Sequence, residues 1–218
     1  MAEDPITWSG LKTSARSWMA EISTDSLSED RLEECIAFAE RHFNRKIRVP
    51  EMEEVVTTTS SAGTFTLPAD FLQLRSIYVD RSPINYLKQL SMAELRESFP
   101  TTATGIPTHY ALQSGDEVVV RPLPSGSFNY ILNYYAKIPA LDAVQTTNWL
   151  LTSHSDLYLA GTLFYTHKFL MDEKRALLFK SEMDLLIEEL HKQRDRKAWA
   201  GAPLAASGSA PSIRNIRA

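Results

Sequence analysis

The chain has 218 residues, of which 44% are hydrophobic and 23% are charged, a balance typical of a folded globular protein rather than a disordered or fibrous one. Its formal net charge of -4 lacks the basic excess that drives binding to a phosphate backbone, which disfavours a dedicated DNA-binding role. Its single cysteine, Cys35, excludes an internal disulfide and is expected to be a small buried apolar residue. The acidic N-terminus is unlike a signal peptide, and no run of about 18 apolar residues predicts a membrane span. We therefore expect a protein that is made in a cytoplasm and has no membrane partner.

Two stripes of apolar residues with helical spacing occupy the first 50 residues. The first begins near Ser9 and comprises Leu11, Ala15, Trp18, Met19 and Ile22. The second comprises Leu32, Cys35, Ile36, Ala39, Phe43 and Ile47. Spacings of three and four residues place each stripe on one side of a helix. Pro50 ends the second helix because a proline cannot continue the backbone hydrogen bonding. We expect the two helices to form an antiparallel hairpin.

Between residues 53 and 139, β-branched and aromatic residues alternate with turn formers. Strands are predicted over residues 55–59, 64–67, 72–79, 109–112, 117–121 and 128–135. The spacing of Ser91 and Glu94 fits a capping box and predicts a short helix over 91–98. The clearest hairpin turns at Ser114-Gly115-Asp116. We expect this region to form a small antiparallel sheet.

Helical periodicity returns with Asp156 in a first turn. One stripe comprises Leu157, Ala160, Leu163, Phe164, His167 and Leu170, and after a break at 171–173 a second comprises Ala176, Phe179, Met183, Leu186 and Leu190. The fold predicted from these patterns is α+β: a four-helix bundle from N- and C-terminal helical hairpins, with an inserted small antiparallel β domain and an extended C-terminal arm. The predicted domains are the bundle (1–52 and 150–197), the β-rich domain (53–149) and the arm (198–218).

No constellation of catalytic or metal-ligating residues is apparent. The five histidines are scattered, and the eight glycines are dispersed rather than clustered in a phosphate-binding loop. Ser153, His154 and Asp156 have the residue types of a hydrolytic triad, but neighbours at a helix start point in different directions, which favours capping for the serine and the aspartate. We predict no catalytic residue, no metal and no cofactor. An enzyme whose site assembles from distant residues is the alternative class.

A basic cluster near the end of the last helix consists of Lys192, Arg194, Arg196 and Lys197. With Asp195 it has a local net charge of +3 (4 minus 1). Cations at a helix C-terminus complement the helix dipole, which is the role we favour. The alternative is contact with DNA at a channel or an interface, and with it the function of a DNA-binding accessory protein.

Residues 198–218 lack periodicity and are rich in small residues, which predicts an extended arm. Beyond its small residues the arm carries apolar and cationic side chains. The candidates for binding a partner are Trp199, Leu204, Ile213, Arg214, Ile216 and Arg217. Such a tethered segment is able to become ordered on the surface of another protein.

Several short motifs follow one another along the chain. They are Ile36–Arg45, Arg48–Glu53, Leu67–Leu72, Gly105–Tyr110, Tyr134–Pro139, Thr147–Leu151 and His154–Gly161. In this order, over roughly residues 8 to 195, the chain resembles the phage head-to-tail adaptor proteins related to the tail tubular protein A of short-tailed phages.

The resemblance implies a non-enzymatic structural protein of the virion neck. Its subunits would form a closed ring of twelve, docked on the portal protein, with the helical domains around the channel through which DNA leaves the capsid. The DNA would pass without sequence-specific binding, which suits a mildly acidic chain. The tail-side partner would be a nozzle, a tail tube or a second connector ring, and the arm would correspond to a portal-gripping C-terminus. An alternative within the same class is a connector of another ring type, nearer the tube or nozzle.

Overall fold

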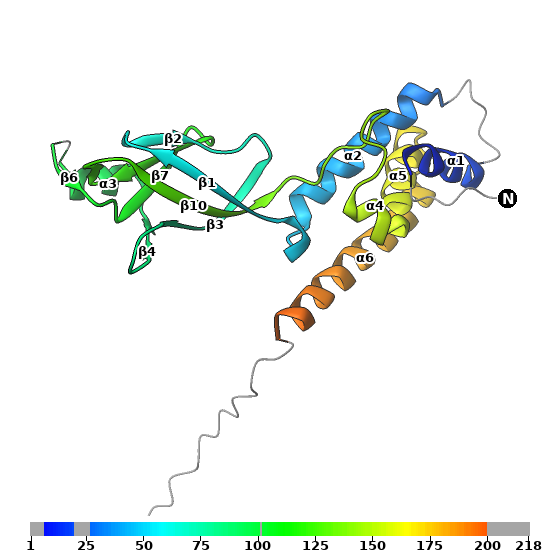
Figure 1. Ribbon diagram of the computed structural model, residues 1–218. Helices are drawn as coiled ribbons and strands as arrows, with labels where there is room; N and C mark the ends of the chain where they lie inside the picture. Colours follow the sequence, from blue (N-terminus) through cyan, green and yellow to red (C-terminus); the bar gives the residue numbers. More distant parts are fainter. Residues whose placement is uncertain (1–6, 20–26, 101, 200–218) are drawn as a thin grey trace, which may run out of the picture.

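The computed structural model describes residues 7–19, 27–100 and 102–199, with side chains as far as residue 196. Most helices lie at one end of an elongated molecule, and the strands lie at the other end (Figure 1). The helical part contains α1 (Trp8–Trp18), α2 (Glu29–Lys46), α4 (Trp149–Ser153), α5 (Ser155–Phe169) and α6 (Glu173–Trp199). A short 3-10 helix, η1 (Pro50–Met52), leads from α2 into the strands.

Helix α5 is the centre of the helical part, because α1, α2, α4 and α6 all pack against it. Its buried residues lie on every side of the helix: Leu157, Tyr158, Ala160, Gly161, Thr162, Leu163, Thr166 and His167. At Gly161 a Cβ atom would lie 2.7 Å from Cζ of Phe43 and 3.2 Å from Cβ of Ala39. The close approach of α2 to α5 therefore depends on a glycine at this position.

The predicted four-helix bundle with a small inserted β domain is wrong. The fold is α+β, with six α-helices and three sheets in the part of the chain that the structure describes. A bundle of two hairpins needs one apolar stripe on each helix. Instead, α5 has buried residues facing four neighbouring helices, residues 149–153 form a separate helix, and α1 packs chiefly against α5 rather than α2.

The two N-terminal stripes have different outcomes. All six residues of the second stripe are buried, including Cys35, and the side chain of Ser28 caps the N-terminus of α2. In α1, however, Trp18 is 63% exposed, because the helix presents its other apolar residues to α5. Trp18 makes only an edge-on contact with Phe179, their ring centres 6.3 Å apart. Ile22 lies outside the described residues.

The strands form a two-layered core. They are β1 (Glu53–Ser60), β2 (Thr64–Thr66), β3 (Phe71–Val79), β4 (Asn85–Tyr86), β5 (Lys88–Gln89), β6 (Thr104–Gly105), β7 (His109–Gln113), β8 (Glu117–Arg121), β9 (Leu123–Pro124) and β10 (Phe128–Ala136). One sheet has the order β1-β10-β3-β4, the second has the order β2-β8-β7-β5, and β6 pairs with β9. The two larger sheets enclose a core in which Phe65 stacks on Tyr130. Helix α3 (Met92–Ser98) covers the other face of the second sheet through Leu95.

The expected single antiparallel sheet is also corrected. The β5–β7 and β6–β9 pairs are parallel, and β2 pairs with β8 rather than with the preceding strand β1. The chain crosses from one layer to the other between Ser60 and Thr64, so consecutive strands belong to different sheets. Two local predictions are confirmed: β7 and β8 form the antiparallel hairpin, and Ser91 and Glu94 form the capping box of α3.

A segment after β10, residues 137–148, lies across the helical part and is called the strap below. Ile138 and Leu141 of the strap are buried in the helical core. The backbone N–H of Ile138 donates to Oδ1 of Asn44 at 2.8 Å, and that of Leu141 donates to Oε1 of Glu40 at 2.9 Å. The strap therefore joins the end of the sheet to α2.

Candidate interaction surfaces

The predicted basic cluster lies on α6, where neighbouring groups compensate much of its charge. Nζ of Lys192 is 2.9 Å from a carboxylate oxygen of Glu188, one helical turn earlier. The guanidinium of Arg194 is 2.7 Å from the carboxylate of Asp195, and it also donates to the backbone carbonyl of Arg48 at 3.0 Å. Arg194 therefore ties α6 to the segment after α2, a structural role that requires no nucleic acid.

The other predicted contact residues lie at or beyond the end of the described chain. Arg196 is an exposed residue of α6, whereas the side chain of Lys197 lies outside the described part. Trp199 is the last residue of α6, and its side chain is also outside that part. The remaining arm residues lie outside the described residues altogether: Leu204, Ile213, Arg214, Ile216 and Arg217. Their role in binding a partner stays a prediction.

The residues with triad chemistry lie where α4 meets α5. Ser153 is the last residue of α4, and the backbone N–H of His154 donates to the carbonyl of Leu150 at 2.8 Å. Oδ1 of Asp156 accepts a hydrogen bond from the N–H of Leu157 at 2.9 Å. These bonds hold the helix ends and provide no path for a proton from the serine to the aspartate. The expected serine cap of α5 was wrong, because His154 occupies the capping position without a side-chain bond to the helix.

Metal ligation and membrane insertion find no support in the described part of the chain. There, no three His, Cys, Asp or Glu side chains are grouped so as to hold a metal ion. None of the described helices combines the length and apolar content that a membrane crossing requires. Burial lowers the pKa of His42, His167 and His191 below the ordinary 6.5, so these imidazoles are neutral at pH 7.

A buried polar network holds the strap on α2. The Tyr158 hydroxyl donates to Oε1 of Glu40 at 3.3 Å, and it accepts from Nδ2 of Asn148 at 2.7 Å. The same amide group donates to the carbonyl of Pro139 at 2.7 Å, while Glu40 also accepts from the N–H of Leu141. Burial raises the pKa of the Glu40 carboxyl and of the Tyr158 hydroxyl. The polar atoms of this network are engaged in hydrogen bonds with one another and with the backbone of the strap. Its role is to join α2, the strap and α5.

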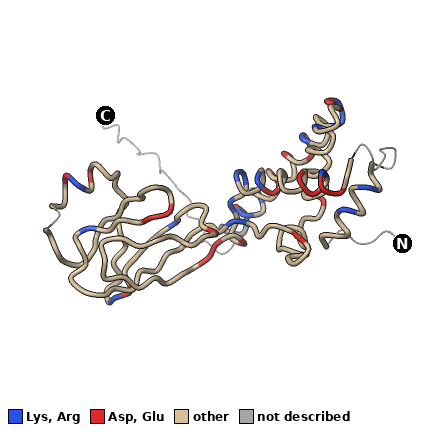
Figure 2. Tube along the Cα trace, turned by 90° about the horizontal axis from the view of Figure 1, so that it is seen from above, with Lys and Arg blue, Asp and Glu red and all other residues tan. Residues whose placement is uncertain are grey.

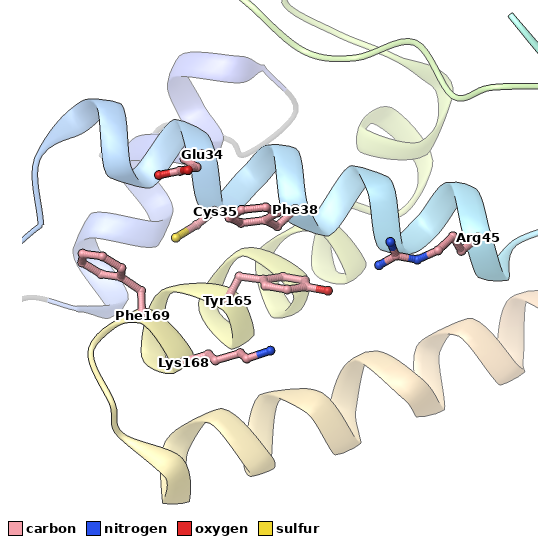
Figure 3. Close-up of a pocket in the computed structure, with 7 residues that line it drawn as sticks. All are labelled: Glu34, Cys35, Phe38, Arg45, Tyr165, Lys168 and Phe169. Atoms are coloured by element: carbon pink, nitrogen blue, oxygen red, sulfur yellow. The ribbon is translucent and has the colours of Figure 1, made fainter.

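An open groove lies between α2 and α5 (Figure 3). Its volume is about 480 Å³, and it is called the α2–α5 groove below. The residues that line it are Glu34, Cys35, Phe38 and Arg45 from α2 and Tyr165, Lys168 and Phe169 from α5. The rings of Phe38 and Tyr165 face each other with their centres 5.8 Å apart, and Phe169 is 45% exposed.

The α2–α5 groove combines exposed aromatic rings with cations. The Arg41 guanidinium lies 5.4 Å from the ring centre of Phe38, and Nζ of Lys168 lies 5.9 Å from that of Tyr165. Such cation–π contacts contribute about 0.5–1 kcal/mol at exposed sites. Within the described residues no carboxylate forms an ion pair with Arg41, Arg45 or Lys168. Glu34, the carboxylate in the groove lining, pairs with Arg31 instead, so these three cations have no ion-pair partner in that part of the chain.

A second hollow, of about 460 Å³, adjoins this groove between α5 and α6. Its lining is Phe164, Lys168, Met171, Glu173, Ala176 and Leu177. Lys168 lines both hollows, so they form one continuous face across the three helices. Figure 2 shows that charged residues of both signs are dense along the helical part and sparser along the strands.

A model of the SU10 adaptor protein family matches residues 6–207 of the chain. The chain belongs to this family. It is a structural adaptor protein of a phage, and its partners are proteins of the phage virion. No curated protein matches the chain. The prediction of a phage adaptor is thereby confirmed, whereas the specific relation to tail tubular protein A stays a prediction.

The sequence patterns did not predict the groove of the adaptor, although a signal was present. Phe38 lies off the apolar stripe of α2, and Tyr165 and Phe169 lie off the stripe assigned to the helix that became α5. Large aromatic residues off a buried stripe, with arginine or lysine three or four residues away, indicate a surface ready for contact. What the sequence could not show is that α2 and α5 bring the two sets together.

Proposed function

We propose that this adaptor joins the portal protein to the tail at the phage neck, as one subunit of a closed ring of twelve around the DNA channel. The match of the family model over residues 6–207 carries the proposal, because it extends over both the helical part and the strands. The resemblance of the motif order to tail tubular protein A-like adaptors supports the ring and its place on the portal. The role is one of positioning, without catalysis, in a virion assembled in the host cytoplasm.

The shape of the molecule supports a connecting role. The helical part and the strands have separate hydrophobic cores at opposite ends of an elongated chain (Figure 1). Two ends with different surfaces allow one to contact the portal and the other to contact a tail nozzle, a tail tube or a second connector ring. A net charge of -4 suits a channel through which DNA slides without sequence-specific binding.

We further propose that residues 198–218 act as the arm that grips the portal. Composition supports this proposal, since small residues separate α6 from an apolar and cationic end around Ile213, Arg214, Ile216 and Arg217. Trp199 and Leu204 would provide contacts near its root. A tether of this kind adds affinity without a large rigid interface, because the second contact occurs at high effective concentration.

The test is binding of the purified adaptor to purified portal rings, measured by co-sedimentation. The full chain should sediment with the portal, and a chain that lacks residues 198–218 should bind at least tenfold more weakly. A second variant keeps the arm at full length but carries Ile213→Ser and Ile216→Ser. It should also bind more weakly than the unchanged chain. A full-length adaptor that stays in the supernatant would overturn the proposed function.

The division into a domain of residues 1–52 with 150–197, a domain of 53–149 and the arm is likewise a proposal. Its support is the separation of the two hydrophobic cores. Limited proteolysis of the assembled ring should first cut the arm and then the junctions near residues 52 and 149. Early cuts inside the two larger sheets would contradict the division.

A further inference from the structure

Helix α6 carries a leucine- and glutamate-rich ridge on the side away from the core. Leu178, Glu182, Leu185 and Glu189 follow one another at spacings of four, three and four residues, which places them on one side of the helix. All four are exposed, and Leu178 and Leu185 are 65% and 61% exposed. These four residues are called the α6 ridge below.

The α6 ridge makes no ion pair and buries neither leucine within the described chain. Its two carboxylates form no ion pair with any described cation, and its two leucines have no buried partner on their outer side. The buried stripe of the same helix lies opposite: Ala176, Phe179, Met183, Ile187 and Leu190. Exposed leucines rimmed by polar residues are typical of a surface that contacts another protein.

The α6 ridge and the α2–α5 groove are complementary in chemistry and in length. The groove offers aromatic rings with Arg45 and Lys168 in its lining and Arg41 over the ring of Phe38, whereas the ridge offers leucines with two glutamates. From Leu178 to Glu189 the ridge extends eleven residues, or about 16 Å along the helix axis, and the groove extends over the same number of residues of α2. Neither surface suits a copy of itself, because like charges would meet.

We infer that the α6 ridge of one adaptor subunit docks in the α2–α5 groove of the next subunit. The inference rests on the proposed ring and names the surfaces that close it. A closed ring needs two different, complementary surfaces on each subunit, and these two lie on separate faces of the same helical part. Leucines would cover the rings of Phe38, Tyr165 and Phe169, while the glutamates would pair with the groove cations and orient the contact.

Disulfide cross-linking on portal rings tests the contact directly. The native thiol is removed by Cys35→Ala, and Phe38→Cys is combined with Leu185→Cys. After oxidation, the chains should migrate as a ladder of linked subunits in non-reducing gels. The matched control replaces Leu185→Cys by Val144→Cys. Val144 is an exposed residue of the strap and belongs neither to the ridge nor to the groove lining, so this control should yield monomers.

Charge reversal provides the second test. Arg41→Glu with Lys168→Glu should reduce the number of adaptor subunits retained on portal rings at least tenfold, and so should Glu182→Lys with Glu189→Lys. A chain with all four changes again places opposite charges at the Arg41 and Lys168 positions of the groove and at the two glutamate positions of the ridge, so it should regain at least part of the assembly that each pair of changes removes. A control with Lys88→Glu and Arg96→Glu, two exposed cations at the strand end, should assemble as the wild type does.

The outcomes separate this inference from the proposed function. If wild-type subunits form rings on the portal but the cysteine pair yields only monomers, the interface is elsewhere and the inference is overturned. If the reversed variants still associate with one another but lose the portal, the groove receives a portal segment instead. If the wild-type protein never binds the portal, the proposed function itself fails.

Discussion

Glu40 offers a sharp test of how the strap is held. Its carboxylate is the acceptor for two buried donors, the N–H of Leu141 and the hydroxyl of Tyr158, and its side chain is only 6% exposed. Glu40→Ala leaves both donors without an acceptor. A buried unsatisfied donor costs about 1–3 kcal/mol, so the variant should lose roughly 2–5 kcal/mol of unfolding free energy.

Glu40→Gln separates hydrogen bonding from charge. The glutamine keeps an oxygen that accepts both bonds, so its stability at pH 7 should lie within about 1 kcal/mol of the wild type. Burial raises the pKa of Glu40 above the ordinary 4.5, which means that the folded state holds the proton more tightly than the unfolded state. The contribution of Glu40 is therefore largest below pH 4.5 and falls as the pH rises through the folded-state pKa. Relative to the glutamine variant, the wild type should lose stability as the pH rises from 4.5 through the folded-state pKa of Glu40.

Urea unfolding followed by tryptophan fluorescence is the assay. All four tryptophans belong to helices of the helical part: Trp8, Trp18, Trp149 and Trp199. The fluorescence therefore reports on the region that Glu40 supports. Equal midpoints for Glu40→Ala and the wild type would refute the reasoning, and so would a glutamine variant as unstable as the alanine variant.

Three further changes have expected outcomes. Gly161→Ala places a methyl group 2.7 Å from Cζ of Phe43, so thermal unfolding should show a loss of about 1–3 kcal/mol, whereas Gly126→Ala, with open space around it, should change little. Burial lowers the pKa of His167, so the contribution of His167 to stability is present above pH 6.5 and is lost on acidification. Replacement of His167 by glutamine should therefore flatten the decline in melting temperature between pH 7.5 and 5.5. Ser91→Ala removes the N-cap of α3 and should cost about 1 kcal/mol, seen as faster hydrogen exchange confined to that helix, and an unchanged exchange rate would contradict the capping role.

Local features of the fold were predictable because the interactions that form them are close in sequence. The Ser91 and Glu94 capping box, the β7–β8 hairpin and the buried stripe of α2 all depend on neighbours within a few residues. The position of Asp156 in the first turn of α5 follows from the same local rules.

Long-range features were not predictable from periodicity. Helix α5 has buried residues on every side, so its pattern has no single stripe that would reveal four neighbours. The separation of β1 and β2 into different sheets is set by the layer that each strand covers, not by the turn between them. Glu40 is a charged residue outside the apolar stripe of α2, and its partners are more than 100 residues away in the sequence.

The candidate surfaces also have a part that was predictable from the sequence and a part that was not. The basic cluster on α6 was visible in the sequence, but its compensation by Glu188, Asp195 and the Arg48 carbonyl needed the structure. The α2–α5 groove arises only where two helices meet, so no single segment contains it. Its aromatic residues were nevertheless detectable as apolar side chains outside the buried stripes.

The proposed function requires this adaptor to form a closed ring on the portal. Electron microscopy of portal rings incubated with the purified adaptor, with the symmetry of the added density counted, tests it most directly. We predict a continuous added ring of twelve subunits, each with its helical part in contact with the next subunit. Portal rings without added density, or with isolated and unconnected subunits, would contradict the account.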